Sequence, residues 1–195
     1  VVMVGIKMSM KQKALTQAQL NLSQGMNITK LIKKVAVFAL MSQLVGTLLL
    51  CLYFIPQLGL KTGFFYGLFH AISAFNNAGF SLFSDSLISH CFEPIVIFTI
   101  SGLIILGGLG FTVVVDIWRC RCPLFSGTCF LFFKFDRLSL HSKIMIIGTL
   151  ILIIGGTLAI YALEQHNPET LLPLSETQKW RIAFFQSVTA RTAGF

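Results

Sequence analysis

The feature that most constrains this chain is a set of three uncharged apolar stretches, each long enough to cross a bilayer. They are Val35–Ile55, Pro94–Val115 and Ile144–Leu163. A transmembrane helix needs roughly 20 predominantly apolar residues. Hydrophobic residues make up 55% of the 195 positions and charged residues only 11%, whereas soluble domains carry about 25% charged residues. The sequence therefore predicts an all-α membrane protein and argues against a soluble globular domain.

Two shorter apolar runs follow the first and third of these stretches. Gly63–Phe75 has 13 residues and Trp180–Ala190 has 11. Apolar runs of about 10–14 residues are typical of re-entrant or buried segments rather than spans. Each run is followed by the tripeptide Ala-Gly-Phe, at 78–80 and at 193–195. We expect each run to enter the membrane as a short pore helix and to leave it through an extended turn.

These features recur in the same order and indicate an internal repeat. A shift of 115 positions superimposes the two Ala-Gly-Phe turns, and a shift of 110 superimposes Gly46-Thr47-Leu48 on Gly156-Thr157-Leu158. The chain lacks an initial Met and ends within the motif, so we expect it to belong to a longer protein. We divide it into residues 1–30 (the end of a first repeat and a basic cytoplasmic linker), 31–118 (a second span–pore–span repeat), 119–142 (a cytoplasmic linker) and 143–195 (the start of a third repeat, to its filter).

The net charge of +8 is distributed unevenly. Six of the 15 basic residues lie between Lys7 and Lys34 and five between Arg119 and Lys143, all in segments expected on one side of the bilayer. Cytoplasmic loops carry such an excess of Lys and Arg. We therefore expect a multi-pass protein of the cell membrane with 7–34 and 116–143 in the cytoplasm. Residues 56–93 and 164–195 should be on the outer side or re-entrant from it. The lipid bilayer explains the basic surplus without a nucleic-acid partner.

The two turns have the composition of an ion passage. A dehydrated ion needs replacement oxygens, which rings of backbone carbonyls supply in potassium filters. Glycine accepts positive φ and keeps side chains out of the lumen. We expect the carbonyls of 77–79 and 192–194 to form two filter strands, with Phe80 and Phe195 packing outward. The negative C-terminal ends of the pore helices favour a cation. The candidate filter residues are Asn77, Ala78, Gly79, Phe80, Thr192, Ala193, Gly194 and Phe195.

Asn76 and Arg191 are the candidate supports of this filter. For the asparagine side chains at 76 and 77, a brace behind the filter and direct coordination of the ion both stay open, although backbone carbonyls usually supply the oxygens. Arg191 either donates to pore-helix carbonyls or sets the field near the ion path. Charges at membrane depth are costly and normally find partners, which favours the first role.

The remaining chemistry-bearing residues point to no catalytic centre. Cys120, Cys122 and Cys129 fall in the expected cytoplasmic linker without a second cysteine pair or a histidine at zinc-finger spacing, so free thiols are favoured over a metal site. No Ser/His/Asp set and no paired acids accompany the turns. We expect no enzyme activity, no resident metal and no cofactor.

The stretches FHAISAFNNAGFSLFSDSL, GGLGFTVVVDIW, LSLHSK and FFQSVTARTAGF closely resemble the Trk/Ktr/HKT superfamily of potassium transporters, and within it the bacterial KtrB-type membrane subunits. The resemblance implies four span–pore–span units around one pore, with the filter positions given above. It implies a homodimer with a cytosolic nucleotide-binding regulatory subunit of the KtrA/TrkA type. Potassium would be the transported ion, and sodium as a coupling or regulatory ion stays open. The apolar, Cys-rich linker CRCPLFSGTCFLFFKF departs from the short basic linker that the family leads us to expect.

A transporter of another class is the alternative. Secondary transporters for organic solutes also use broken helices at mid-membrane. Their repeats typically have inverted topology, whereas the two units here run in the same orientation. A potassium-translocating subunit of a Ktr/Trk-type uptake system is therefore the favoured function.

Overall fold

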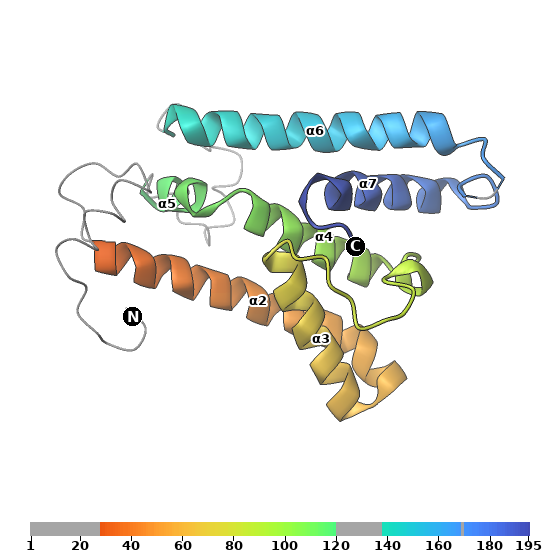
Figure 1. The fold of residues 1–195 in the computed structure, drawn as a ribbon, viewed down its shortest axis with the longest axis horizontal. Coiled ribbons are helices and arrows are strands. Elements are labelled where there is room, and N and C mark those ends of the chain that lie inside the picture. The colour runs from red at the N-terminus through yellow and green to blue at the C-terminus, as the bar shows by residue number, and fades with distance from the viewer. Residues whose placement is uncertain (1–27, 120–137, 169) are drawn as a thin grey trace, which may run out of the picture. The chain divides into compact units, whose positions relative to one another are not determined.

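The computed structural model describes residues 28–119, 138–168 and 170–195, and within these ranges it contains helices and no strand. The expected all-α fold is confirmed. In chain order the elements are α2 (Ile28–Leu58), α3 (Leu60–Phe75), the 3₁₀ turn η1 (Ile88–His90), α4 (Pro94–Gly108), α5 (Phe111–Arg119), α6 (Leu140–Glu164) and α7 (Glu176–Thr192). Figure 1 shows their course.

Two of the helices, α2 and α6, are by themselves long and apolar enough to cross a membrane. The third expected span, Pro94–Val115, was wrong as a continuous helix. It is divided into α4 and α5, and Leu109 and Gly110 lie between them. Gly110 has a φ of +82°, a conformation that glycine adopts at little cost and that ends the helix. Counted as one broken span, the pair brings the number of described spans to three.

The chain forms two compact units. The first consists of residues 1–40 and 111–143. In its described part, the Asp116 carboxylate accepts hydrogen bonds from the hydroxyls of Ser139 and Ser142. Ser139 immediately precedes α6, where a negative charge is stabilised by the helix dipole. The predictions for residues 1–27, and for the linker with Cys120, Cys122 and Cys129, lie outside the described residues.

The second unit, residues 41–110 and 144–195, holds both candidate turns. Its α2 part and α3 pack backbone against backbone. A β-carbon placed on Gly63 would lie 2.6 Å from Cα of Ile55, and one on Gly67 would lie 3.0 Å from Sγ of Cys51. Small residues permit such close approach between membrane helices, where dispersion contacts rather than the hydrophobic effect drive association. The short helix α3 is thereby packed closely against α2.

The α6 part of this unit and α7 form the corresponding pair (Figure 1). A β-carbon on Gly156 would lie 2.4 Å from Oγ of Ser187, and that hydroxyl donates to the Ile153 carbonyl at 2.9 Å. Near the other end of the pair, the Tyr161 and Trp180 rings stack with centroids 4.2 Å apart. The equivalent residues Thr47 and Thr157 each donate to the carbonyl four residues earlier. The two pairs therefore share local structure as well as sequence order.

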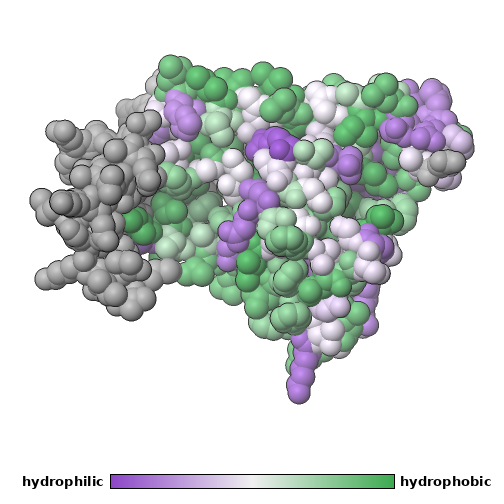
Figure 2. Space-filling view, in the orientation of Figure 1, coloured by the Kyte–Doolittle hydropathy of each residue, from purple (hydrophilic) through white to green (hydrophobic). Residues whose placement is uncertain are grey.

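The remaining helix of the second unit, α4, packs against both short helices, α3 and α7. The largest fully buried side chains lie at this junction, among them Phe54, Leu50, Ile97, Ile100 and Ile104. Many other large apolar side chains of α2 and α6 are exposed, as Leu52 (69%) and Ile151 (64%) illustrate. Figure 2 shows apolar surface over α6 and hydrophilic side chains gathered where α6 turns into α7. Exposed apolar helix faces are what a lipid environment requires.

Candidate functional site

The first turn begins where α3 ends, at Phe75. The Asn76 N–H donates to the Ile72 carbonyl at 3.1 Å and the Ala78 N–H to the Ser73 carbonyl at 2.9 Å. Asn77 has a φ of +53° and Gly79 a φ of +69°. Asparagine and glycine are the residues that tolerate this left-handed region. The chain therefore reverses at the carbonyl end of α3 and continues through residues 78–80 without regular secondary structure.

The second turn differs in its first residues. Thr192 is still helical, as the last residue of α7, and Ala193 has near-helical angles of −99° and −50°. The expected extended strand across 192–194 is therefore wrong for its first two residues, because α7 continues further than the apolar run predicted. Gly194 then takes a φ of +78°, matching the positive φ of its counterpart Gly79.

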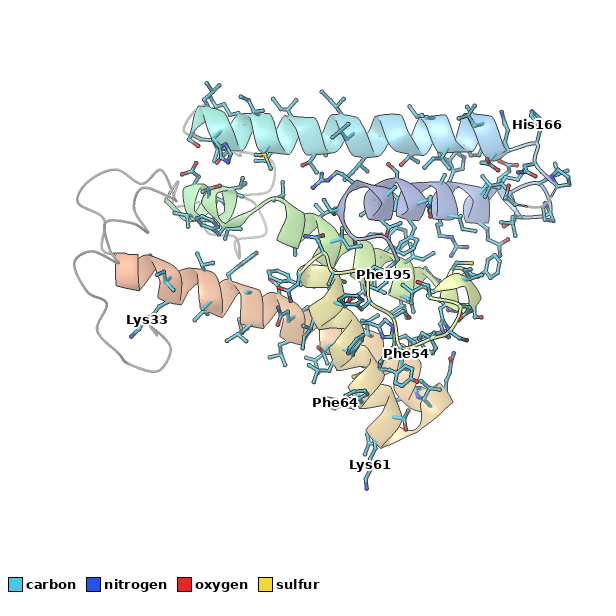
Figure 3. The ribbon with its side chains drawn as sticks, viewed as in Figure 1. Lys33, Phe54, Lys61, Phe64, His166 and Phe195 are labelled. Carbon is cyan, nitrogen blue, oxygen red and sulfur yellow. The ribbon has the colours of Figure 1, made fainter. Side chains whose placement is uncertain are left out.

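The two turns meet directly. A β-carbon placed on Gly79 would lie 1.9 Å from the carbonyl oxygen of Ala193 and 3.3 Å from the carbonyl carbon of Gly194. No side chain fits at position 79, so the close approach requires glycine for a steric reason as well as a conformational one. Phe195 packs on the core cluster beside α4 (Figure 3). Phe80 is 69% exposed, so within the described residues only Phe195 of the two phenylalanines packs against the core.

The glycines at the end of α4 bring this helix against the first turn. A β-carbon on Gly107 would lie 1.8 Å from the Phe75 carbonyl oxygen, and one on Gly108 would lie 2.8 Å from Nη2 of Arg191. The glycines of the Gly-Gly-Leu-Gly stretch therefore permit close packing, and the last of them lies in the helix break. Arg191 is half-buried, with its guanidinium next to α4.

The side chains of Asn76 and Asn77 behave differently. Asn76 is exposed, and its Nδ2 donates back to the Ile72 carbonyl at 2.8 Å. Asn77 is half-buried and reaches α4 and the second turn. With its amide oriented to match its neighbours, it accepts from the Gly108 N–H and donates to the Ile104 carbonyl and to Oγ1 of Thr192, each at 3.1 Å. Asn77 is thus a brace, whereas Asn76 closes its own helix.

Hydroxyl groups that the sequence analysis did not select hold the phenylalanines of both turns. Oγ of Ser73 donates to the Phe80 carbonyl at 2.8 Å, and the Phe195 N–H donates to Oγ1 of Thr189 at 2.8 Å. Both hydroxyls lie in the last turns of their pore helices and are buried. The shift of 115 positions that superimposes the two turns does not pair these two hydroxyls, because it aligns Thr189 with Ala74 rather than with Ser73.

A histidine cluster supports the segment that follows the first turn. His70 is fully buried, and its Nε2 is 3.1 Å from Oγ of Ser81. Oγ of Ser81 also donates to the Ser86 carbonyl at 3.0 Å. Outside the spans, Nδ1 of His90 is 3.1 Å from the Tyr53 hydroxyl, and burial lowers the pKa of His90 below its usual value. These contacts fix the return path of the chain.

The arrangement offers oxygen ligands and no fixed counter-charge. Backbone carbonyls of two neighbouring turns lie at the C-terminal ends of two helices, where the helix dipole contributes about half a negative charge each. The titratable groups of the described residues form no group of three that could hold a metal. Carbonyls and helix dipoles attract a cation but do not bind it as tightly as a carboxylate ring would. This chemistry suits passage of a monovalent cation.

The comparisons with known proteins agree with this chemistry. Residues 3–195 match the model of the TrkH family, described as "Cation transport protein". The chain is 45% identical over 193 residues to "Ktr system potassium uptake protein B" of Vibrio alginolyticus, covering 99% of the chain and 40% of the relative. It is 40% identical over 195 residues to the protein of the same name from Bacillus subtilis, covering 100% of the chain and 41% of the relative.

A third relative is the "Potassium/sodium uptake protein NtpJ" of Enterococcus hirae, 35% identical over 189 residues, or 97% of the chain and 39% of the relative. The chain therefore spans about two fifths of the length of the curated relatives it matches. The family match covers residues 3–195, so both candidate turns lie within the matched length.

Proposed function

Because the chain belongs to the TrkH family of cation transport proteins, we propose that its two turns form adjacent walls of a potassium-selective passage. The observation that carries the proposal is the direct contact between the turns, in which Gly79 lies against the Ala193 carbonyl. The proposed filter residues are those of the two turns, namely Asn77, Ala78, Gly79, Phe80, Thr192, Ala193, Gly194 and Phe195.

The mechanism follows from the backbone. A potassium ion that enters loses water, and carbonyl oxygens of the two turns replace part of its hydration shell. The C-terminal dipoles of α3 and α7 stabilise the ion without trapping it. Glycine at 79 and 194 keeps side chains out of the passage. Arg191 beside Gly108 supports the second turn from behind rather than facing the ion.

The wider assembly is part of the proposal. The protein would lie in the cell membrane, with 7–34 and 116–143 cytoplasmic and with 56–93 and 164–195 outside or re-entrant. It would act as a homodimer with a cytosolic nucleotide-binding regulatory subunit of the KtrA/TrkA type, and sodium would act as a coupling or regulatory ion. The names of the relatives support the assignment to a potassium-uptake system. No observation favours an organic solute as the cargo.

A chimaera tests the proposal. These 195 residues replace the matching segment of the Vibrio alginolyticus relative, and the chimaera is produced in cells deficient in potassium uptake. We expect growth at low potassium and uptake of rubidium as a potassium substitute. A chimaera that is present in the membrane in normal amounts but gives neither growth nor uptake refutes the proposal.

A further inference from the structure

The Asn77 amide is placed between the two groups that an α-helix would join to each other. In a regular helix the Gly108 N–H bonds the Ile104 carbonyl, four residues earlier. The Asn77 amide accepts from that N–H and donates to that carbonyl, each at 3.1 Å. A side chain that enters the i→i−4 ladder is a recognised cause of helix bending. The amide therefore lies at the last turn of α4, directly before the break at Leu109 and Gly110.

The second N–H of the same amide leads to the neighbouring turn. It donates to Oγ1 of Thr192 at 3.1 Å. Thr192 lies 115 residues further on and is the counterpart of Asn77 in the repeat. Beside this link, Gly79 lies against the Ala193 carbonyl. One side chain thus touches α4, its own turn and the next turn.

This engagement favours the brace among the two roles left open for Asn77. The two amide hydrogens are both donated to protein acceptors, and the oxygen accepts from the Gly108 N–H. The oxygen is therefore directed toward α4, and one of its two lone pairs is used there. The asparagine side chain acts by its position between α4 and the second turn.

We propose that the Asn77–Thr192 hydrogen bond is a positioning element that sets ion discrimination by fixing the spacing of the two neighbouring turns, and that it links this spacing to the end of α4. The inference rests on the proposed function. Carbonyl cages discriminate potassium from sodium through their size and the number of their oxygens. A bond that joins two walls of such a cage therefore controls selectivity without touching the ion.

The test uses the same chimaera and measures rubidium uptake in competition with sodium. Thr192→Val keeps the shape of the side chain and removes its hydroxyl. Losing the bond should lower the rubidium-to-sodium preference about two- to tenfold, the range for one net hydrogen bond. Thr192→Ser retains the hydroxyl and should restore the preference. Thr157→Val, which removes a hydroxyl bonded within α6, is the control for the loss of a threonine hydroxyl away from the turns.

A double-mutant cycle identifies the partner of Thr192. In an Asn77→Ala background the Thr192→Val change should have no further effect on the ion preference, because the shared bond is already absent. Equal preferences for Thr192→Val and Thr192→Ser in the stable, folded chimaera would overturn the inference, as would full additivity with Asn77→Ala. In both cases an active parent chimaera would leave the proposed function standing. An inactive but properly inserted parent would overturn the proposed function and this inference with it.

Discussion

Replacing Gly79 by alanine tests the contact between the two turns most directly. The new β-carbon would lie 1.9 Å from the Ala193 carbonyl oxygen, and β-carbons essentially never approach other atoms closer than 3.0 Å. The turns must therefore separate by about 1.5–2 Å to regain an ordinary contact. In addition, alanine at a φ of +69° costs about 1–2 kcal/mol.

Gly59 provides a control for positive φ without a steric contact. Its φ is +80° and its ψ is 165°, and nothing lies within 4 Å of a β-carbon placed on it. Gly59→Ala should therefore lower the free energy of unfolding by about 1–3 kcal/mol through backbone strain alone, because this region is essentially restricted to glycine. Gly79→Ala should add an overpacking cost of about 1–3 kcal/mol to its own backbone strain.

Two assays on the chimaera separate the effects. Thermal unfolding in detergent should rank the parent above Gly59→Ala and Gly59→Ala above Gly79→Ala. Rubidium uptake in competition with sodium should change only for Gly79→Ala, because only this variant moves the walls of the passage apart. Equal melting temperatures for the two variants, together with an unchanged ion preference, would refute the steric argument.

Two further pairs of substitutions test the packing around the site by the same unfolding measurement. Gly63→Ala forces α3 away from the backbone of α2 and should destabilise by about 1–3 kcal/mol, whereas Gly102→Ala meets open space and should stabilise α4 by up to about 1 kcal/mol. Ser73→Ala removes the hydroxyl partner of the Phe80 carbonyl and should cost about 0.5–1.5 kcal/mol. Ser101→Ala removes a buried hydroxyl without a partner among the described residues and should be neutral or stabilising. Reversed signs within either pair would contradict the packing described.

The sequence predicted the features that depend on local pattern. The length of the apolar runs indicated α3 and α7, and the repeated Ala-Gly-Phe located the positive-φ glycine of each turn. The break after α4 escaped prediction, because a glycine within an apolar run is equally compatible with a continuous membrane helix. Besides Gly110, a tertiary contact lies at this break, since Asn77 reaches the last turn of α4 from another part of the chain.

The conformation of the second turn also could not be predicted from local sequence pattern. Its resemblance to the first turn suggested two identical strands, yet Thr192 is helical where Asn77 has left the helix. Local propensity alone does not decide whether each of these residues is helical. Asn77 and Thr192 are also bonded to each other across the turns, and this contact is tertiary. Likewise, the hydrogen bonds of Ser73 and Thr189 form only because the backbones of Phe80 and Phe195 fold back against the helix ends. Only the folded structure supplies that information.

The contact between Asn77 and Thr192 also bears on how a repeated architecture diverges. Asn77 touches its own counterpart in the next repeat, Thr192. Between identical subunits, such a contact would need one residue type to serve both as donor and as acceptor. Within a single polypeptide the two positions are encoded separately. Asparagine can therefore specialise as donor and threonine as acceptor, and natural selection can adjust each of the two positions independently of the other.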